Sequence, residues 1–291
     1  MIIDAHYHLE VRLEAVDRLL DQMRKHGIDR VALIPVLSDP FHLGIVANTL
    51  SGIMRKALSG SWNNIGLFMY NTTVTRSGKF SVMGKTYCIY EKPDNESTAQ
   101  VMKSHPDKFL AWIGVNPKVA DPIPEMEKWA GKPGWIGVKC HPFWHCYPVG
   151  MLDNVAAYCA ERNLPILIHL GGNKERGDYK FLPERHPKLT IIYAHAGVPY
   201  YGELWQYIKA KGNLFVDLSS PYLDEPLRLA ALKTLGAQKC LYGSDGPYGY
   251  PDSSDGLYDH GAILGEIMRA PLSDSDKKLI FSGNFKAIIK M

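Results

Sequence analysis

Two histidines near the start of the chain, His6 and His8, are the first residues whose spacing indicates chemistry. They follow the apolar residues Ile2 and Ile3, a pattern typical of a buried strand. Residues two apart on a strand project from the same face, so both imidazoles would lie side by side at the strand end. Paired imidazoles can form half of a metal site.

Several later strand-like segments also end in residues that can bind a metal or move a proton. These residues are Lys139, His141, His169, His195 and Asp245. The carboxyl ends of parallel strands in a closed barrel meet at one rim, where barrel enzymes carry out catalysis. Each residue alone has a structural explanation, such as a hydrogen-bonded histidine, a solvated lysine or a turn aspartate. Their joint occurrence favours a site for Zn²⁺ or a similar divalent ion.

Short apolar segments alternate with amphipathic helical segments along most of the chain. Eight such strand–helix units predict an α/β fold, a single-domain (β/α)8 TIM barrel over residues 1–291. A doubly wound open sheet is the main alternative. The predicted strands are 1–6, 30–36, 109–115, 135–140, 165–170, 190–194, 214–218 and 239–242. The predicted helices are 13–26, 97–105, 124–129, 151–162, 179–186, 202–211, 225–235, 260–269 and 274–291.

Residues 38–94 interrupt this alternation between the second predicted strand and its helix. The segment is too long for a plain loop and is rich in Gly, Asn, Ser and Thr. We interpret it as an insertion over the carboxyl-terminal face of the barrel that serves as a lid or a subunit contact. A homodimer is therefore an expectation, although no residue pattern requires one. The sequence does not predict the internal structure of the insertion.

Composition narrows the choice of partners and compartment. The chain has 33 basic and 30 acidic residues without a basic run, so we expect neither a nucleic acid nor an anionic membrane as partner. The five cysteines form no C-x-x-C pair, and no apolar run approaches the roughly 20 residues of a membrane span. These features predict a reduced, cytoplasmic protein that acts on a small molecule.

Taken together, the strand-end motifs resemble those of the amidohydrolase superfamily. The resemblance is greatest to its amidohydrolase-related branch (amidohydrolase 2), which includes aminocarboxymuconate-semialdehyde decarboxylase. It covers nearly the whole chain, from residue 2 to residues 283–287. The motifs are specific for the superfamily and indicate little about the substrate. They are His6-Tyr-His8, Gly137-Val-Lys139-Cys-His141-Pro142, Leu167-Ile-His169-Leu-Gly171, Ala194-His195-Ala-Gly197 and Gly243-Ser-Asp245-Gly-Pro247.

The resemblance also implies roles for individual residues. In a two-metal site His195 would be a further ligand, and in a one-metal site it would be an acid–base or electrophilic group. Lys139 matches a position that is a carboxylated, metal-bridging lysine in some relatives, but not in the decarboxylase-like branch. We expect one ion, zinc first with manganese or iron as alternatives, and Lys139 neutralising substrate charge. The implied metal ligands are His6, His8, His169 and Asp245.

The expected reaction is hydrolysis of a small amide, lactone or ester. A divalent metal lowers the pKa of bound water from 15.7 to about 7. Asp245 would accept the proton of that water, Asp245 or His195 would protonate the leaving group, and His195 or Lys139 would stabilise the oxyanion.

Two alternatives remain open at this point. The first is a non-oxidative decarboxylase of a small carboxylic acid, with Arg55 or Arg76 holding the carboxylate. The second is a barrel that has lost catalysis and serves as a binding module. The candidate substrate-binding residues are Lys139, His141, Arg55 and Arg76.

Overall fold

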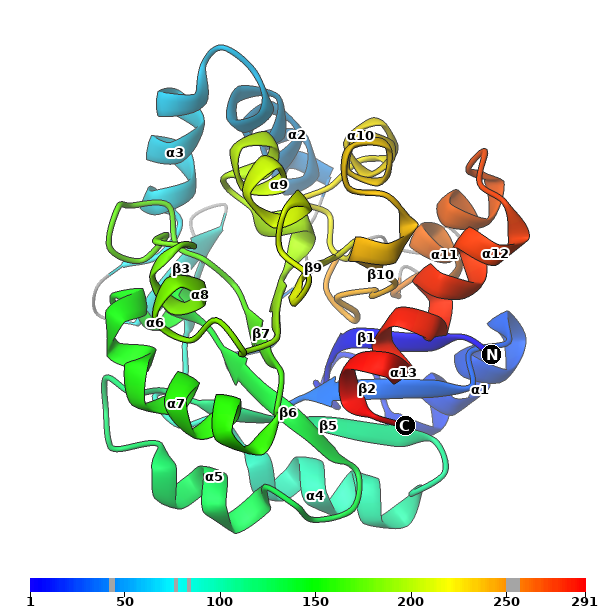
Figure 1. The fold of residues 1–291 in the computed structure, drawn as a ribbon. Coiled ribbons are helices and arrows are strands. Elements are labelled where there is room, and N and C mark those ends of the chain that lie inside the picture. The colour runs from blue at the N-terminus through cyan, green and yellow to red at the C-terminus, as the bar shows by residue number, and fades with distance from the viewer. Residues whose placement is uncertain (42–44, 76–77, 83–84, 250–256) are drawn as a thin grey trace.

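A parallel sheet forms the centre of the protein. The computed structural model describes residues 1–41, 45–75, 78–82, 85–249 and 257–291. Its main sheet has eight strands in the order β1-β2-β5-β6-β7-β8-β9-β10, and every pair is parallel (Figure 1). The strands are β1 (Ile3–His8), β2 (Arg30–Ile34), β5 (Phe109–Val115), β6 (Trp135–Cys140), β7 (Ile166–Ile168), β8 (Ile191–Tyr193), β9 (Leu214–Asp217) and β10 (Cys240–Leu241).

The sheet closes on itself between β1 and the segment that follows β10. The Ala5 amide donates to the carbonyl of Tyr242 at 3.1 Å, and the Asp245 amide donates to the carbonyl of His6 at 2.7 Å. A barrel has no free strand edge, so these contacts explain how a strand of two residues is retained. The predicted (β/α)8 barrel is therefore confirmed, and the open-sheet alternative is wrong.

Helices cover the outside of the sheet (Figure 1). Some helix ends carry residues that satisfy the free backbone groups: Asp94 and Asp224 cap helix N-termini, and Gly27 ends the first helix in the left-handed region. They are α1 (Val16–His26), α4 (Asn95–Ser104), α5 (Ile123–Trp129), α6 (Pro142–His145), α7 (Asp153–Arg162), α8 (Phe181–Arg185), α9 (Tyr201–Lys209), α10 (Glu225–Leu235) and α11 (Gly261–Arg269). None of the helices in the described ranges is long and apolar enough to cross a membrane.

The predicted segments agree with the structure except at some boundaries. The third and fourth predicted strands have the same first and last residues as β5 and β6. The predicted single helix over 274–291 is wrong, because the chain there forms α12 (Asp274–Lys278), a π-helical turn (Leu279–Gly283) and α13 (Asn284–Ile289). The π turn places Ile280 and Phe281 in the core, with the Ile280 carbonyl accepting the Tyr242 amide at 2.9 Å.

The predicted insertion contains secondary structure of its own. It consists of the helices α2 (Ile45–Ser59) and α3 (Asn63–Thr72), followed by the two-stranded antiparallel sheet of β3 (Lys79–Val82) and β4 (Lys85–Cys88). An antiparallel bridge between Ser38 and Ile89 joins its two ends. Figure 1 shows α2 and α3 side by side at one end of the molecule, next to α9. The role of the insertion as a lid or a subunit contact stays a prediction.

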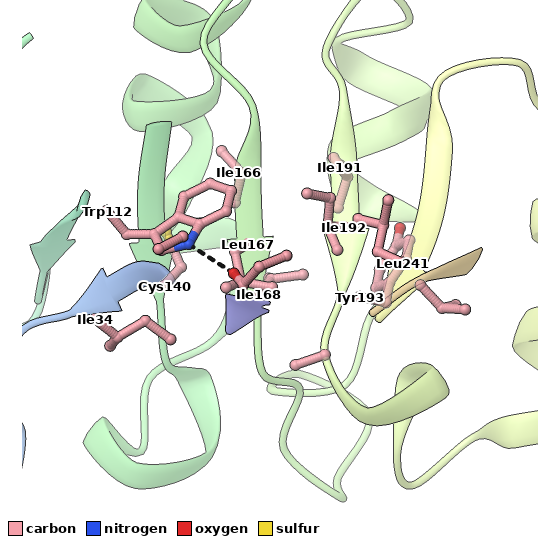
Figure 2. Close-up of a cluster of buried hydrophobic side chains, with 14 of the residues drawn as sticks. Ile34, Trp112, Cys140, Ile166, Leu167, Ile168, Ile191, Ile192, Tyr193 and Leu241 are labelled. Carbon is pink, nitrogen blue, oxygen red and sulfur yellow. Dashed lines mark hydrogen bonds between the residues drawn. The ribbon is translucent and has the colours of Figure 1, made fainter. Parts of the chain in front are cut away.

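Apolar side chains fill the barrel interior and hold its strands in register. Trp112 of β5 is completely buried, and its indole N–H donates to the carbonyl of Ala5 on β1 at 3.0 Å. Figure 2 shows this side chain beside Ile166, Leu167 and Ile168 of β7, with Ile191 and Ile192 of β8 opposite. Such strands are apolar on both faces because helices cover the outside while side chains fill the inside.

Substitution of Gly137 tests how tightly β6, the strand that carries Lys139, is packed. A Cβ atom at this position would lie 2.4 Å from the carbonyl oxygen of Pro165 and 2.7 Å from the Trp112 ring. We expect Gly137→Ala to lower the free energy of unfolding by about 1–3 kcal/mol, measured by chemical denaturation. The control is Gly202→Ala on α9, where a Cβ meets no atom within 4 Å. Equal stability of the two variants would contradict this account.

Candidate metal centre and active site

The ends of the barrel strands meet the insertion at a cavity of about 280 Å³. The barrel supplies all the histidines and the aspartate, and the insertion supplies five apolar side chains together with serines and threonines. From the barrel come His8, His141, Trp144, His169, His195, Ser220, Pro221, Tyr222, Asp245 and Tyr248. From the insertion come Phe41, Leu50, Ser51, Met54, Met69, Thr72, Thr73, Phe80 and Ser81.

His6 presents one defined ring nitrogen to this site. Its Nδ1 lies 2.8 Å from Asp217 Oδ2, which can only accept, so Nδ1 carries the proton and donates it. Nε2 then holds a lone pair, 3.2 Å from Asp245 Oδ1. Burial and the charge of Lys139 lower the pKa of His6, but Asp217 and Asp245 outweigh them and the pKa is raised. A proton and a metal ion therefore compete for Nε2.

His195 is oriented by the same carboxylate through a serine. The Ser219 hydroxyl donates to Asp217 Oδ1, so its oxygen accepts the proton of His195 Nδ1 at 2.8 Å. The Nε2 atom of His195 is thus left with a lone pair. Burial lowers the pKa of His195 to about 3, so the ring is neutral at ordinary pH.

His169 is oriented by a residue of the insertion. Tyr70 donates its single proton to the carbonyl of Leu170 at 2.9 Å, so its oxygen accepts from His169 Nε2 at 2.8 Å. The lone pair of His169 is consequently on Nδ1, which lies 3.1 Å from His195 Nε2. Burial lowers the pKa of His169 well below its usual range, so the ring is neutral as well.

These proton positions test whether the residues fit a metal ion. His169 Nδ1 and His195 Nε2 are both buried lone pairs, and at 3.1 Å two such atoms repel unless a cation lies near them. Ligand atoms of His6, His195 and Asp245 all lie within 4.8 Å of one another. Nitrogen and carboxylate donors arranged in this way fit a divalent ion such as zinc.

Asp245 and His8 complete the polar side of the cavity. Asp245 Oδ1 lies 3.3 Å from His8 Nε2. Burial alone would raise the pKa of Asp245, but His195, His6 and His8 hold it well below its usual range. Burial lowers the pKa of His8 to about 4. An ionised carboxylate therefore sits beside the neutral imidazoles of His8 and His195, a charge distribution that favours a cation.

The remaining predicted residues fall in three places. Lys139 is buried with its Nζ 3.4 Å from His6 Nε2, and burial lowers its pKa to about 8. His141 lines the cavity, accepts the Trp144 amide at Nδ1 and stacks on His169 with 4.4 Å between ring centroids. The Arg55 guanidinium donates to the carbonyl of Pro221 and lies 3.5 Å from Asp224, and Arg55 is not among the residues that line the cavity. Arg76 lies outside the described residues.

Sequence reasoning missed three residues that orient the histidines: Asp217, Ser219 and Tyr70. Asp217 ends the apolar strand β9, and an acid at a strand end could have been noticed beside the histidines at the other ends. Ser219 carries no signal apart from that position. Tyr70 could not be found from sequence, because its place depends on how α3 is seated against the residues that follow β7.

Backbone conformation also marks this rim of the barrel. His195, Ala196, Ser220 and Asp245 all adopt positive φ, at 54°, 51°, 76° and 60°. Residues with a side chain there cost of order 1 kcal/mol or more each and persist only where their surroundings fix them. The hydrogen bonds to Asp217 and the barrel-closing contact of Asp245 provide that constraint.

A parallel barrel whose strand ends carry converging imidazoles and a carboxylate defines the class of metal-dependent barrel enzymes. The family model described as Amidohydrolase (amidohydrolase 2) matches residues 76–287. The chain belongs to the amidohydrolase family, as its motifs predicted, and it is an enzyme rather than an inactive binding barrel. A search of curated proteins found no match.

Solved structures with the same fold include several enzymes. 4-Oxalomesaconate hydratase from Rhodopseudomonas palustris has a TM-score of 0.60 and 19% identity, covering 100% of this chain and 96% of its own. 2,6-Dihydroxybenzoate decarboxylase from Rhizobium has a TM-score of 0.62 and 14% identity, covering 99% and 98%. A dihydroxybenzoic acid decarboxylase from a Polaromonas species, with bound manganese and 2-nitroresorcinol, has a TM-score of 0.61 and 15% identity, covering 99% and 96%. At these identities the likeness concerns the fold.

The hydrogen bonds of Asp217 give a direct prediction for metal binding. In Asp217→Asn an amide replaces one accepting oxygen, so the His6 Nδ1 proton loses its defined partner. The ring can then carry its proton on Nε2, where it would block the metal. We expect Zn²⁺ affinity, measured by isothermal titration calorimetry, to fall about 10- to 100-fold. The control is Asp153→Asn, which removes an exposed carboxylate paired with Arg185. Unchanged Zn²⁺ affinity in Asp217→Asn would contradict the orienting role.

Proposed function

We propose that the protein is a metal-dependent hydrolase of a small, mainly apolar amide, lactone or ester, with one ion, most suitably Zn²⁺. The observation that carries the proposal is the set of converging lone pairs on His6, His169 and His195 around the Asp245 carboxylate, beside an apolar cavity. Manganese is the next choice, because a neighbour with the same fold binds it.

The cavity wall supports the choice of substrate. Phe41 and Tyr248 stack with 4.4 Å between their ring centroids, and Phe80 and Trp144 lie beside them. No Lys or Arg side chain is found among the described residues that line the cavity. A cavity of this kind fits a ring or short apolar body that brings one polar group to the histidines.

The residues of the chain divide the proposed chemistry between them. A bound divalent ion would supply a water of lowered pKa and polarise a carbonyl group. Asp245, ionised and 10% exposed, accepts the proton of the attacking water and returns it to the leaving group. His195, held by Ser219 with Nε2 free, acts as a further ligand or a second base. Lys139 adds positive charge behind His6 and favours the developing oxyanion.

A second candidate function is non-oxidative decarboxylation of a small carboxylic acid. The observation that favours it is the buried ammonium group of Lys139, which supplies a positive field next to the imidazole of His6. Arg55, the other cation proposed for this role, is occupied by Pro221 and Asp224. The contribution of Arg76 stays a prediction.

Removal of the metal or its ligands tests the shared part of both functions. We expect dialysis against a chelator, His6→Ala and Asp245→Asn each to reduce turnover at least about a hundredfold, with re-addition of Zn²⁺ or Mn²⁺ restoring only the dialysed wild type. Activity is assayed with apolar esters, lactones and amides, and in parallel by CO₂ release from aromatic and unsaturated acids. Full activity of the metal-free protein would refute the proposal, and CO₂ release without hydrolysis would favour the second function.

Lys139 separates the two functions within a single variant. Lys139→Met removes the buried positive charge but keeps a side chain of similar length. If the substrate is an anion, KM for that acid should rise about tenfold or more, while KM for a neutral ester changes little. Comparison of the two substrate classes on the same protein is the control for structural damage. Equal effects on both classes would show that Lys139 does not neutralise substrate charge.

A further inference from the structure

We infer that Tyr70 of the insertion is a positioning residue of the metal centre. Through its hydroxyl, metal binding and the packing of helix α3 against the barrel depend on each other. The inference rests on the proposed function in requiring that a metal binds. It adds a component of the centre that lies outside the barrel and outside the strand-end motifs.

The position of Tyr70 is fixed on several sides. The side chain is fully buried, and its ring stacks on Phe143 with 4.2 Å between centroids and 16° between planes. Gly172 permits this approach, because a Cβ atom there would lie 2.8 Å from the Tyr70 ring. The hydroxyl is thereby held between the carbonyl of Leu170, at 2.9 Å, and His169 Nε2, at 2.8 Å.

The hydroxyl decides which nitrogen of His169 is available. Its proton goes to the Leu170 carbonyl, so its oxygen requires a proton on His169 Nε2 and leaves the lone pair on Nδ1. Without this oxygen the ring can place its proton on Nδ1 instead. An Nδ1–H group would then donate to His195 Nε2, 3.1 Å away, and that single hydrogen bond would occupy a ligand atom of both histidines. Tyr70 therefore suppresses a specific arrangement that competes with the metal.

The insertion and the barrel share the task of orienting the imidazoles. Asp217 and Ser219, on β9 and just after it, fix His6 and His195. Tyr70 does the same for His169 from α3, which is remote in sequence. Because coupling between two equilibria is reciprocal, a metal that requires this tautomer also favours the conformation in which α3 is seated.

Metal titration tests the inference with a matched control. We expect Tyr70→Phe, which keeps the ring on Phe143, to weaken binding of Zn²⁺ and Mn²⁺ by about 10- to 100-fold in isothermal titration calorimetry. Tyr193→Phe is the control, since it also loses a buried hydroxyl that donates to a carbonyl, that of Tyr179 at 2.6 Å, away from the ligands. Its metal affinity should equal that of the wild type.

A double-mutant cycle shows whether the effect passes through His169. In a His169→Ala background, Tyr70→Phe should cause no further loss of metal affinity. The same loss in both backgrounds would assign Tyr70 a general structural role and overturn the inference. Circular dichroism of each variant checks that the barrel is folded.

Hydrogen exchange provides a readout that needs no substrate. Added Zn²⁺ should slow amide exchange in residues 63–72 of the wild type, and this protection should be lost in Tyr70→Phe. Wild type that takes up neither Zn²⁺ nor Mn²⁺ would refute the proposed function itself. Wild type that binds metal while Tyr70→Phe binds it equally tightly would overturn the role of Tyr70 alone.

Discussion

The Asp217 carboxylate, completely buried at the end of β9, determines the protonation of the site around it. Burial alone would raise its pKa, but the charge and hydrogen bond of His6, together with His195, hold the pKa below its usual range. A buried carboxylate is tolerated only where its oxygens are satisfied, and here it accepts the His6 ring proton, the Ser219 hydroxyl and the His195 amide. Its charge therefore sets the proton positions on two candidate ligands at once.

The same region also holds the barrel closed. His6 accepts the Asp245 amide through its carbonyl and donates its own amide to Asp4 at 3.0 Å. Asp4 in turn accepts the amide of Ser244 at 3.0 Å, so the first and last strands are joined beside the candidate ligands His6 and Asp245. The contacts that close the sheet therefore also fix the backbone that carries His6 and Asp245. The positive φ values of His195 and Asp245 are maintained by this network, because their conformations are unfavourable for an isolated chain.

Sequence predicted the barrel and the titratable residues at its strand ends because both are encoded locally. An apolar run followed by a histidine or an aspartate is visible without tertiary information, and β5 and β6 were predicted to the residue. Side chains that act on other side chains are not encoded in this way. Asp217 acquires its role from residues 211 and 22 positions away, and Tyr70 from one 99 positions away. Charge alone suggested Arg55, whereas packing pairs it with Asp224.

The division of labour between barrel and insertion limits how this enzyme can change its substrate. Most of the apolar wall comes from the insertion, so altering specificity means altering side chains such as Phe41, Met54 or Phe80. Helix α3, which contributes Met69 and Thr72 to the cavity, also delivers the Tyr70 hydroxyl to His169, and a shift of one residue in α3 would move that hydroxyl by about 100° around the helix axis. Substitutions in the wall can therefore be tolerated, whereas insertions or deletions that change the register of α3 would disturb the proposed metal centre. Specificity can vary only within a backbone that keeps this one hydrogen bond.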